Sequence, residues 1–350
     1  MMNETVTVKP LINPVMWVAG GGGNYLVFRC LDFFCALAVS IYHIGFLDPL
    51  GKDYNIWMVN GVYIFYAISG YVTMLSTELG CQKFMIKRLI KIFPLYWFLT
   101  FATFGAMKLL PSLFPYEPSF SELLKSLFLI PYAHQATATA SAMYPIVSMG
   151  HTIQTTMLYY LVFWVIANIS HKNRGWLSSL VIVIIVACGI CFKPSSAILK
   201  FYLKPDIIFF IAGIAAFYVC KSKAWQSLNL SSGTIVLASI LFVVTMFFNV
   251  RWILLLLILL LMCVTVKIDR TKISNTSVFK ILAVMGNWTF SYFLIHLYVI
   301  RFAEVLGGTE FNLRAVTCDF IAIVIAWGVS FVLYELIEKR FTNVLKRYLL

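Results

Sequence analysis

Charged side chains are scarce in this chain. Asp, Glu, Lys and Arg together make up 12% of its 350 residues, whereas 61% of the residues are hydrophobic. Soluble domains carry about 25% charged residues, so the composition excludes a soluble globular domain. The mean hydropathy of +0.89 indicates an integral membrane protein instead.

Acidic residues are the scarcer charge, with 14 Asp and Glu against 27 Lys and Arg. A net charge of +13 is also typical of nucleic-acid-binding proteins. Here, however, the basic residues stand in short segments between apolar runs, where membrane topology and anionic lipid headgroups account for them. We therefore expect membrane lipid, and no nucleic acid, as a partner.

The chain also lacks a metal-binding cysteine pattern and a typical secretory leader. Cys188 and Cys191 form a C-x-x-C, but no second pair completes a zinc site. The eight cysteines mostly lie within or beside apolar stretches, as small hydrophobic residues do. Near the N-terminus, Glu4 accompanies Lys9 and Pro14 interrupts the apolar run, which is unlike a signal peptide. We expect no metal site and no cleaved leader.

Long apolar stretches recur along the chain, and ten of them approach the ~20 residues that a membrane-spanning helix needs. They lie at residues 25–47, 56–77, 92–110, 146–169, 176–192, 206–220, 233–248, 252–268, 281–302 and 315–336. A further stretch, residues 123–133, is typical of an interfacial or re-entrant piece. The pattern predicts an all-α, polytopic membrane protein with about ten transmembrane helices. Its transmembrane domain covers residues 25–337, between terminal segments 1–24 and 338–350.

The distribution of Lys and Arg predicts the orientation. Most of them fall in segments that lie on the inner side if both termini are cytoplasmic, and cytoplasmic loops are the ones enriched in these residues. Lys193, Lys200 and Lys204 in one outer loop run against this pattern. We expect both terminal segments to be cytoplasmic.

The first apolar stretch carries three ionisable residues, which are expensive in a membrane and therefore functional candidates. Arg29 and Asp32 are three residues apart, so they share one face of a helix and can neutralise each other. His43 lies eleven residues beyond Asp32, about three helical turns further on the same face. One helix thus presents an ion pair near its start and an imidazole near its end.

Three of the five histidines are predicted to lie at a similar depth. In the expected topology His43, His151 and His296 fall in the outer half of the membrane on three different spans. This favours one polar chamber that opens outward. The alternative is three separate packing histidines, each satisfied locally.

The inner side carries a basic stripe, in which Lys83, Lys87 and Lys91 stand at helical spacing with Arg88 adjacent. One interpretation is anchoring on anionic lipid. The other is a phosphate clamp, since Arg offers a planar fork and Lys a point charge. In the preceding span, the pair Ser69-Gly70 allows close approach of a helix or a ligand.

Several stretches together resemble the acyltransferase family 3 membrane proteins, especially the branch that acetylates bacterial exopolysaccharides and O-antigens. The similar stretches are ALAVSIYH at 36–43, FYAISGYV at 65–72, KRLIKIFPLYW at 87–97, LIP at 129–131, GHTIQTTMLYYLVF at 150–163, GNWTFSYFLIH at 286–296 and YELIEKRF at 334–341. The resemblance covers nearly the whole chain, and the motifs together are fairly specific.

The resemblance implies a multi-pass enzyme of the bacterial inner membrane that moves an acyl group, usually acetyl, from cytoplasmic acyl-CoA to a sugar hydroxyl on the outer side. Acetyl-CoA would be a substrate, and no bound cofactor is implied. His43 would be the general base that acts on the sugar, with Arg29 and Asp32 beside it in the catalytic set. Acyl-CoA would bind at Lys87, Arg88 and Lys91 and along Ser69-Gly70.

The chain departs from the family pattern at two places. The family carries Arg eleven residues before the histidine and an acid three residues earlier, whereas here Asp32 and Arg29 stand in the reverse order. In the fourth span the expected acid is Thr156 and the usual Trp is His151. We keep His151, Gln154, Thr156 and His296 as acceptor-side candidates. An altered acceptor, a relay through His151, or a non-catalytic membrane carrier or assembly subunit remain alternatives.

Overall fold

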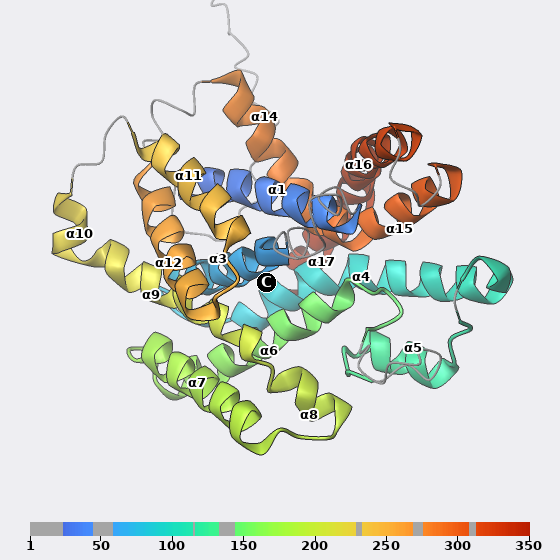
Figure 1. Cartoon of the computed structure of the whole chain (residues 1–350). Coiled ribbons are helices and arrows are strands. Elements are labelled where there is room, and N and C mark those ends of the chain that lie inside the picture. Colours follow the sequence, from blue (N-terminus) through green and yellow to red (C-terminus); the bar gives the residue numbers. More distant parts are fainter. Residues whose placement is uncertain are drawn as a thin grey trace, which may run out of the picture.

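The computed structural model describes residues 24–44, 59–114, 116–132, 144–228, 233–268, 276–307 and 313–350. These residues form helices and connecting turns and contain no strand, which confirms the all-α prediction. Figure 1 shows α1 and α3 in the middle of the bundle, with α11 and α12 on one side, α15 and α16 on the other, and α7 and α8 at the bottom.

Each of the ten predicted apolar stretches coincides with helix. The long helices are α1 (Asn24–His43), α3 (Asn60–Ser76), α4 (Phe84–Leu109), α6 (Gly150–Ile169), α7 (Arg174–Phe192), α9 (Phe209–Lys221), α11 (Thr234–Phe247), α12 (Arg251–Lys267), α15 (Thr289–Gly307) and α16 (Leu313–Leu333). Shorter elements are α5 (Phe120–Leu127), α8 (Ala197–Tyr202), α10 (Lys223–Ser227), α14 (Ser277–Met285), α17 (Lys339–Leu349), the 3-10 turns η3 (Pro111–Leu113), η4 (Pro205–Ile208) and η5 (Gly286–Trp288), and the π-turn η6 (Tyr334–Glu338).

Seven helical stretches of the described residues are long and apolar enough to cross a membrane. The helices α3 and α12, with 17 residues each, and α11, with 14, are shorter. Large side chains such as Ile184 on α7 and Val324 on α16 are exposed on the outside of the bundle, where a lipid bilayer would cover them. The protein is a multi-pass membrane protein; the count of ten spans and the orientation stay predictions.

The centre of the bundle depends on a close crossing of α3 and α9. A Cβ atom at Gly70 would clash with the carbonyl oxygen of Phe210, and one at Gly213 would clash with the carbonyl oxygen of Ala67. Small residues of this kind let two backbones approach where lipid gives no hydrophobic drive for association. The sequence left open whether a helix or a ligand approaches Gly70 closely. In the structure, helix α9 makes this close approach.

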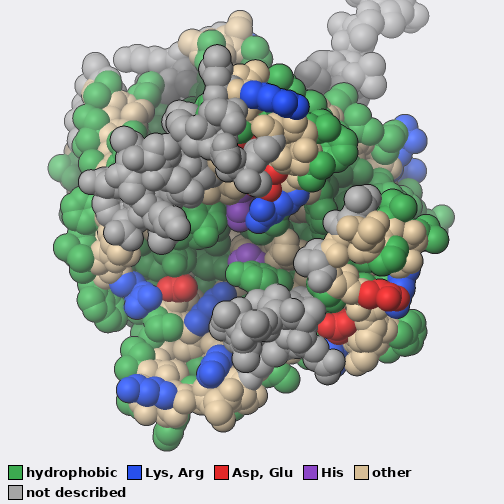
Figure 2. All heavy atoms as spheres, turned by 45° about the vertical axis from the view of Figure 1, so that its right-hand side comes forward, with side chains coloured by type: hydrophobic (Ala, Val, Ile, Leu, Met, Phe, Trp, Pro, Cys, Tyr) green, Lys and Arg blue, Asp and Glu red, His purple; other side chains and the backbone are tan. Residues whose placement is uncertain are grey.

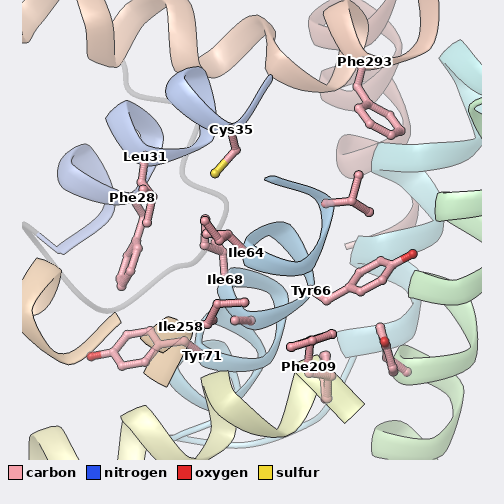
Figure 3. Packing of buried hydrophobic residues seen from close by; sticks show 14 of the residues in the cluster. Phe28, Leu31, Cys35, Ile64, Tyr66, Ile68, Tyr71, Phe209, Ile258 and Phe293 are labelled. Carbon is pink, nitrogen blue, oxygen red and sulfur yellow. The ribbon is translucent and has the colours of Figure 1, made fainter. Parts of the chain in front are cut away.

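Apolar side chains from several helices fill the middle of the bundle. Figure 3 shows Phe28, Leu31 and Cys35 of α1 close to Ile64 and Ile68 of α3. All five are less than 9% exposed. Tight packing of this kind supplies the dispersion contacts that stabilise helix association inside a membrane.

The C-terminal stretch is one continuous helical rod. Helix α16 passes through η6 into α17, which packs along α4. The predicted boundary between residues 337 and 338 lies inside η6, and Glu338 is buried at 2% exposure. The buried core therefore extends to this position at least.

Candidate functional site

A cavity of about 220 Å³ lies between α1, α3, α4, α6 and the segment formed by η5 and α15. Its polar and charged lining consists of Arg29, Asp32, Ser69, Arg88, Lys91, Thr152, Thr156, Asn287 and Thr289. Six of these residues were predicted as site residues from the sequence, and they come from four different helices. Most of the remaining wall is apolar, with Phe28, Phe65 and Phe293 among its members.

On α1, Arg29 and Asp32 both face this cavity, so their placement on one helix face is as predicted. The close approach of η5 to α1 is possible because Gly286 has no Cβ, which would otherwise clash with the backbone of Arg29. The salt bridges of the described residues do not include an Arg29–Asp32 pair. The two charged groups are therefore not in direct salt-bridge contact, and each side chain lines the cavity. Their mutual neutralisation stays a prediction.

The basic stripe divides between the cavity and the surface. Arg88 is 5% exposed and lines the cavity, with its guanidinium carbon 4.8 Å from the ring centroid of Tyr160 and 5.2 Å from that of Phe84. Lys87 is exposed and does not line the cavity. Lys83 is also exposed, and its ammonium donates to the main-chain oxygen of Leu350. Only the inward part of the stripe, Arg88 with Lys91, can contact a molecule in the cavity.

Lys91 is tied to an acid that the sequence did not single out. Its ammonium lies 2.7 Å from Oε1 of Glu338 in η6, and Ser291 of α15 donates to the other carboxylate oxygen at 2.8 Å. Both charged residues are less than 9% exposed. The pair therefore connects the cavity wall to the C-terminal rod.

The cavity forms one polar level of the bundle. A second polar level lies further along the bundle, where His43 and His296 face each other with ring centroids 5.2 Å apart. His43 is the last residue of α1, about 16 Å beyond Asp32 at 1.5 Å per residue. On the face of the molecule drawn in Figure 2, histidine side chains lie in a hollow, with basic and acidic side chains around it. Two of the three predicted histidines therefore meet.

The ring of the third histidine, His151, is hydrogen-bonded to residues at and just before the start of its own helix, α6. Its Nδ1 donates to the carbonyl oxygen of Ser148 at 2.8 Å, and Thr152 donates to its Nε2 at 3.3 Å. The ring of Tyr144 packs against it with centroids 5.1 Å apart. His151 also lies within electrostatic range of His43.

Two acceptor-side candidates on α6 have different surroundings. Thr156 lines the cavity and donates to the carbonyl oxygen of Thr152 at 2.8 Å. Gln154 is 1% exposed and does not line the cavity, and its amide has no hydrogen-bond partner among the described residues.

Several residues around the two levels went unpredicted. Asn287 lines the cavity, Tyr292 stacks on His296, and Glu338 pairs with Lys91. The available signal for Glu338 was its place in the YELIEKRF segment, residues 334–341. Within the described part of the chain, no three His, Cys, Asp or Glu side chains gather as a metal site would require.

Comparison with known proteins gives a family. The acyltransferase domain family matches residues 28–335, which includes every described helix from α1 to α16 apart from the first residues of α1. Neither the curated proteins nor the solved structures gave a match. The matched region contains the whole cavity lining and both facing histidines. The chain therefore belongs to acyltransferase family 3.

Proposed function

We propose that this protein moves an acyl group, acetyl in the first instance, from cytoplasmic acyl-CoA to a hydroxyl of an outward-facing surface polysaccharide or its lipid-linked precursor. It would do so in the bacterial inner membrane. Family membership supports the transfer of an acyl group. The observation that supports the rest is the presence of buried Arg88 and Lys91 at the cavity and of two facing imidazoles further along the bundle. One of these imidazoles, His43, lies about 16 Å beyond Asp32 on α1.

At the inner level, the buried Arg88 is the best candidate to hold phosphate of acyl-CoA. Its planar guanidinium is held beside the rings of Phe84 and Tyr160, and an Arg fork suits phosphate oxygens. Lys91 lies next to Glu338, which offsets much of its charge. Lys87 is exposed on the same helical turn and does not line the cavity, so it would contribute only a point charge at longer range.

From this anchor the acyl thioester would extend through the cavity toward His43. Polar groups along the way, among them Ser69 and Asn287, can hydrogen-bond amides of the CoA arm, while the apolar wall accommodates its carbon atoms. Phe293 lines the cavity and also contacts the ring of His296, with centroids 5.9 Å apart. It therefore stands between the two levels.

The chemistry requires one base. His43 takes the proton of the sugar hydroxyl while the oxygen attacks the thioester carbonyl carbon, and a C–O bond forms. The C–S bond then breaks, and the sulfur leaves as thiolate. The imidazolium of His43 gives its proton to this sulfur, so the products are the sugar ester and the CoA thiol, and His43 is neutral again.

The test uses inverted membrane vesicles from the host cells, which carry their own glycan acceptor and expose the cytoplasmic face to radiolabelled acetyl-CoA. Transfer is measured as base-labile label in the glycan. His43→Ala should lower the rate by about 100-fold or more, since general-base catalysis contributes 10²–10⁴-fold, while acetyl-CoA binding persists. The control is His171→Gln, because the His171 side chain does not line the cavity and donates to the main-chain oxygen of Thr77.

Wild-type rates in His43→Ala vesicles would place the base elsewhere, with His151 and His296 as the next positions to change. A purified protein that neither binds nor turns over acetyl-CoA would contradict the enzyme assignment. It would favour the non-catalytic carrier or assembly subunit.

A further inference from the structure

The ring of His296 is held in one orientation by its own helix. Its Nδ1 lies 2.9 Å from the carbonyl oxygen of Phe293 and 3.2 Å from that of Tyr292. A carbonyl oxygen only accepts, so Nδ1 carries the proton and donates. In the neutral ring, Nε2 is then left with a lone pair and acts as an acceptor.

Stacking and a tether to α1 fix this ring further. Tyr292 stacks on His296 with centroids 5.3 Å apart, and Trp327 stacks on Tyr292 at 4.1 Å. The hydroxyl of Tyr292 is hydrogen-bonded to Ser40, which lies three residues before His43. The two histidines are therefore held at matching heights on α1 and α15.

The acceptor on His296 is unused. Its Nε2 is buried and has no hydrogen-bond partner among the described residues, and the whole residue is 1% exposed. A buried acceptor without a donor costs free energy, so such an atom in a fixed ring points to a partner that arrives during function. The ring that faces it is that of His43, at 5.2 Å between centroids.

We propose that His296 is a positioning residue for His43, and this inference rests on the proposed function. When the acceptor sugar is bound, Nε2 of His296 accepts the N–H of His43. This bond fixes the tautomer of His43, so that its other nitrogen presents a lone pair to the sugar hydroxyl. A base that is oriented by a third group is the usual arrangement for such proton transfers.

The same bond stabilises the charged intermediate. When His43 takes the sugar proton it becomes an imidazolium, and its N–H bond to His296 becomes charge-assisted and stronger. Two imidazoles joined by an N–H···N bond of about 3 Å have centroids a little over 5 Å apart. The observed 5.2 Å therefore needs only a rotation of the His43 ring to close the bond.

The decisive variant is His296→Phe, which keeps an aromatic ring on Tyr292 and removes the acceptor. We expect kcat in the vesicle assay to fall by about 10- to 100-fold, as misplacement of a catalytic group does, with KM for acetyl-CoA unchanged. His296→Gln has an acceptor oxygen and should recover much of the rate. The control is Tyr298→Phe, two residues further along α15, which removes the hydroxyl that accepts a hydrogen bond from Thr103.

A double variant separates positioning from a structural role. If His296 acts through His43, then adding His296→Phe to His43→Ala should lower the residual rate no further. Additive losses would overturn the inference, and so would an unchanged kcat in His296→Phe. A raised KM for the glycan at unchanged kcat would mean that His296 contacts the sugar directly.

Failure of the two proposals can be told apart. Full activity in His43→Ala contradicts the proposed base, whereas full activity in His296→Phe alone contradicts only the positioning role. Should the Phe variant not accumulate in the membrane, His296→Leu replaces it in the comparison with His296→Gln, since leucine is similar in size to glutamine and has no acceptor.

Discussion

Replacing Glu338 by glutamine should destabilise the protein by about 3 kcal/mol. The ammonium of Lys91 and the carboxylate of Glu338 are 2.7 Å apart, and their side chains are 10% and 2% exposed. At an effective dielectric constant of about 20, this distance corresponds to about 6 kcal/mol of attraction before desolvation. Removing one partner of a buried pair costs about 3–5 kcal/mol, and partners available in the unfolded state within the membrane favour the low end.

Glutamine is the informative replacement because it has nearly the same shape as glutamate, and its amide oxygen can still accept the hydrogen bond from Ser291. The change therefore removes mainly the negative charge. Unfolding in detergent can be followed by a thiol-reactive dye, since Cys35 is fully buried and Cys263 is 2% exposed. The matched control is Glu117→Gln. Its pair with Lys108 has side chains 58% and 41% exposed, and such surface pairs contribute about 1 kcal/mol or less.

A double variant checks the reasoning. Lys91→Met with Glu338→Gln removes both charges and should be more stable than Glu338→Gln alone, because the buried ammonium is gone. Equal losses for Glu338→Gln and Glu117→Gln, or additive losses in the double variant, would show that the pair is not a buried charge pair. Stability and transfer activity must be measured separately, since Lys91 also lines the cavity.

Two further changes test the packing and the donor site. Gly70→Ala should sharply reduce the amount of folded protein in size-exclusion chromatography, because the new Cβ would clash with the carbonyl oxygen of Phe210. The control is Gly105→Ala, whose new Cβ would meet no atom within 4 Å. This change should be neutral or should stabilise the protein by up to about 1 kcal/mol. Arg88→Lys keeps the charge but loses the planar fork, so acetyl-CoA binding should weaken about tenfold in a filter-binding assay; unchanged binding would remove Arg88 from the phosphate site.

The helices could be predicted well from the sequence because lipid imposes a simple rule. A segment in the bilayer must satisfy its own backbone hydrogen bonds, so a long apolar stretch becomes a helix. All ten stretches obey this rule in the described residues. The ends of the helices are less predictable. Helix α4 begins eight residues before the predicted start at residue 92, because the basic segment 84–91 is also helical.

The site could be predicted only in part, because periodicity gives faces and not neighbours. Spacing on α1 placed Arg29 and Asp32 on one face, and both line the cavity. The same arithmetic could not show whether the two charged groups touch, because helical spacing does not determine the rotamers of the side chains. Glu338 was missed for a related reason: its partner lies more than 240 residues away, on α4.

The two departures from the family pattern take on a different meaning in three dimensions. In the sequence they are independent, with the reversed Arg29 and Asp32 on one span and Thr156 in place of an acid on another. In the structure all three residues line the same cavity. Asp32 contributes a carboxylate and Arg29 a cation to the lining of the cavity that Thr156 also lines. The two departures therefore fall on the wall of a single cavity, whereas a comparison made span by span treats them as unrelated changes.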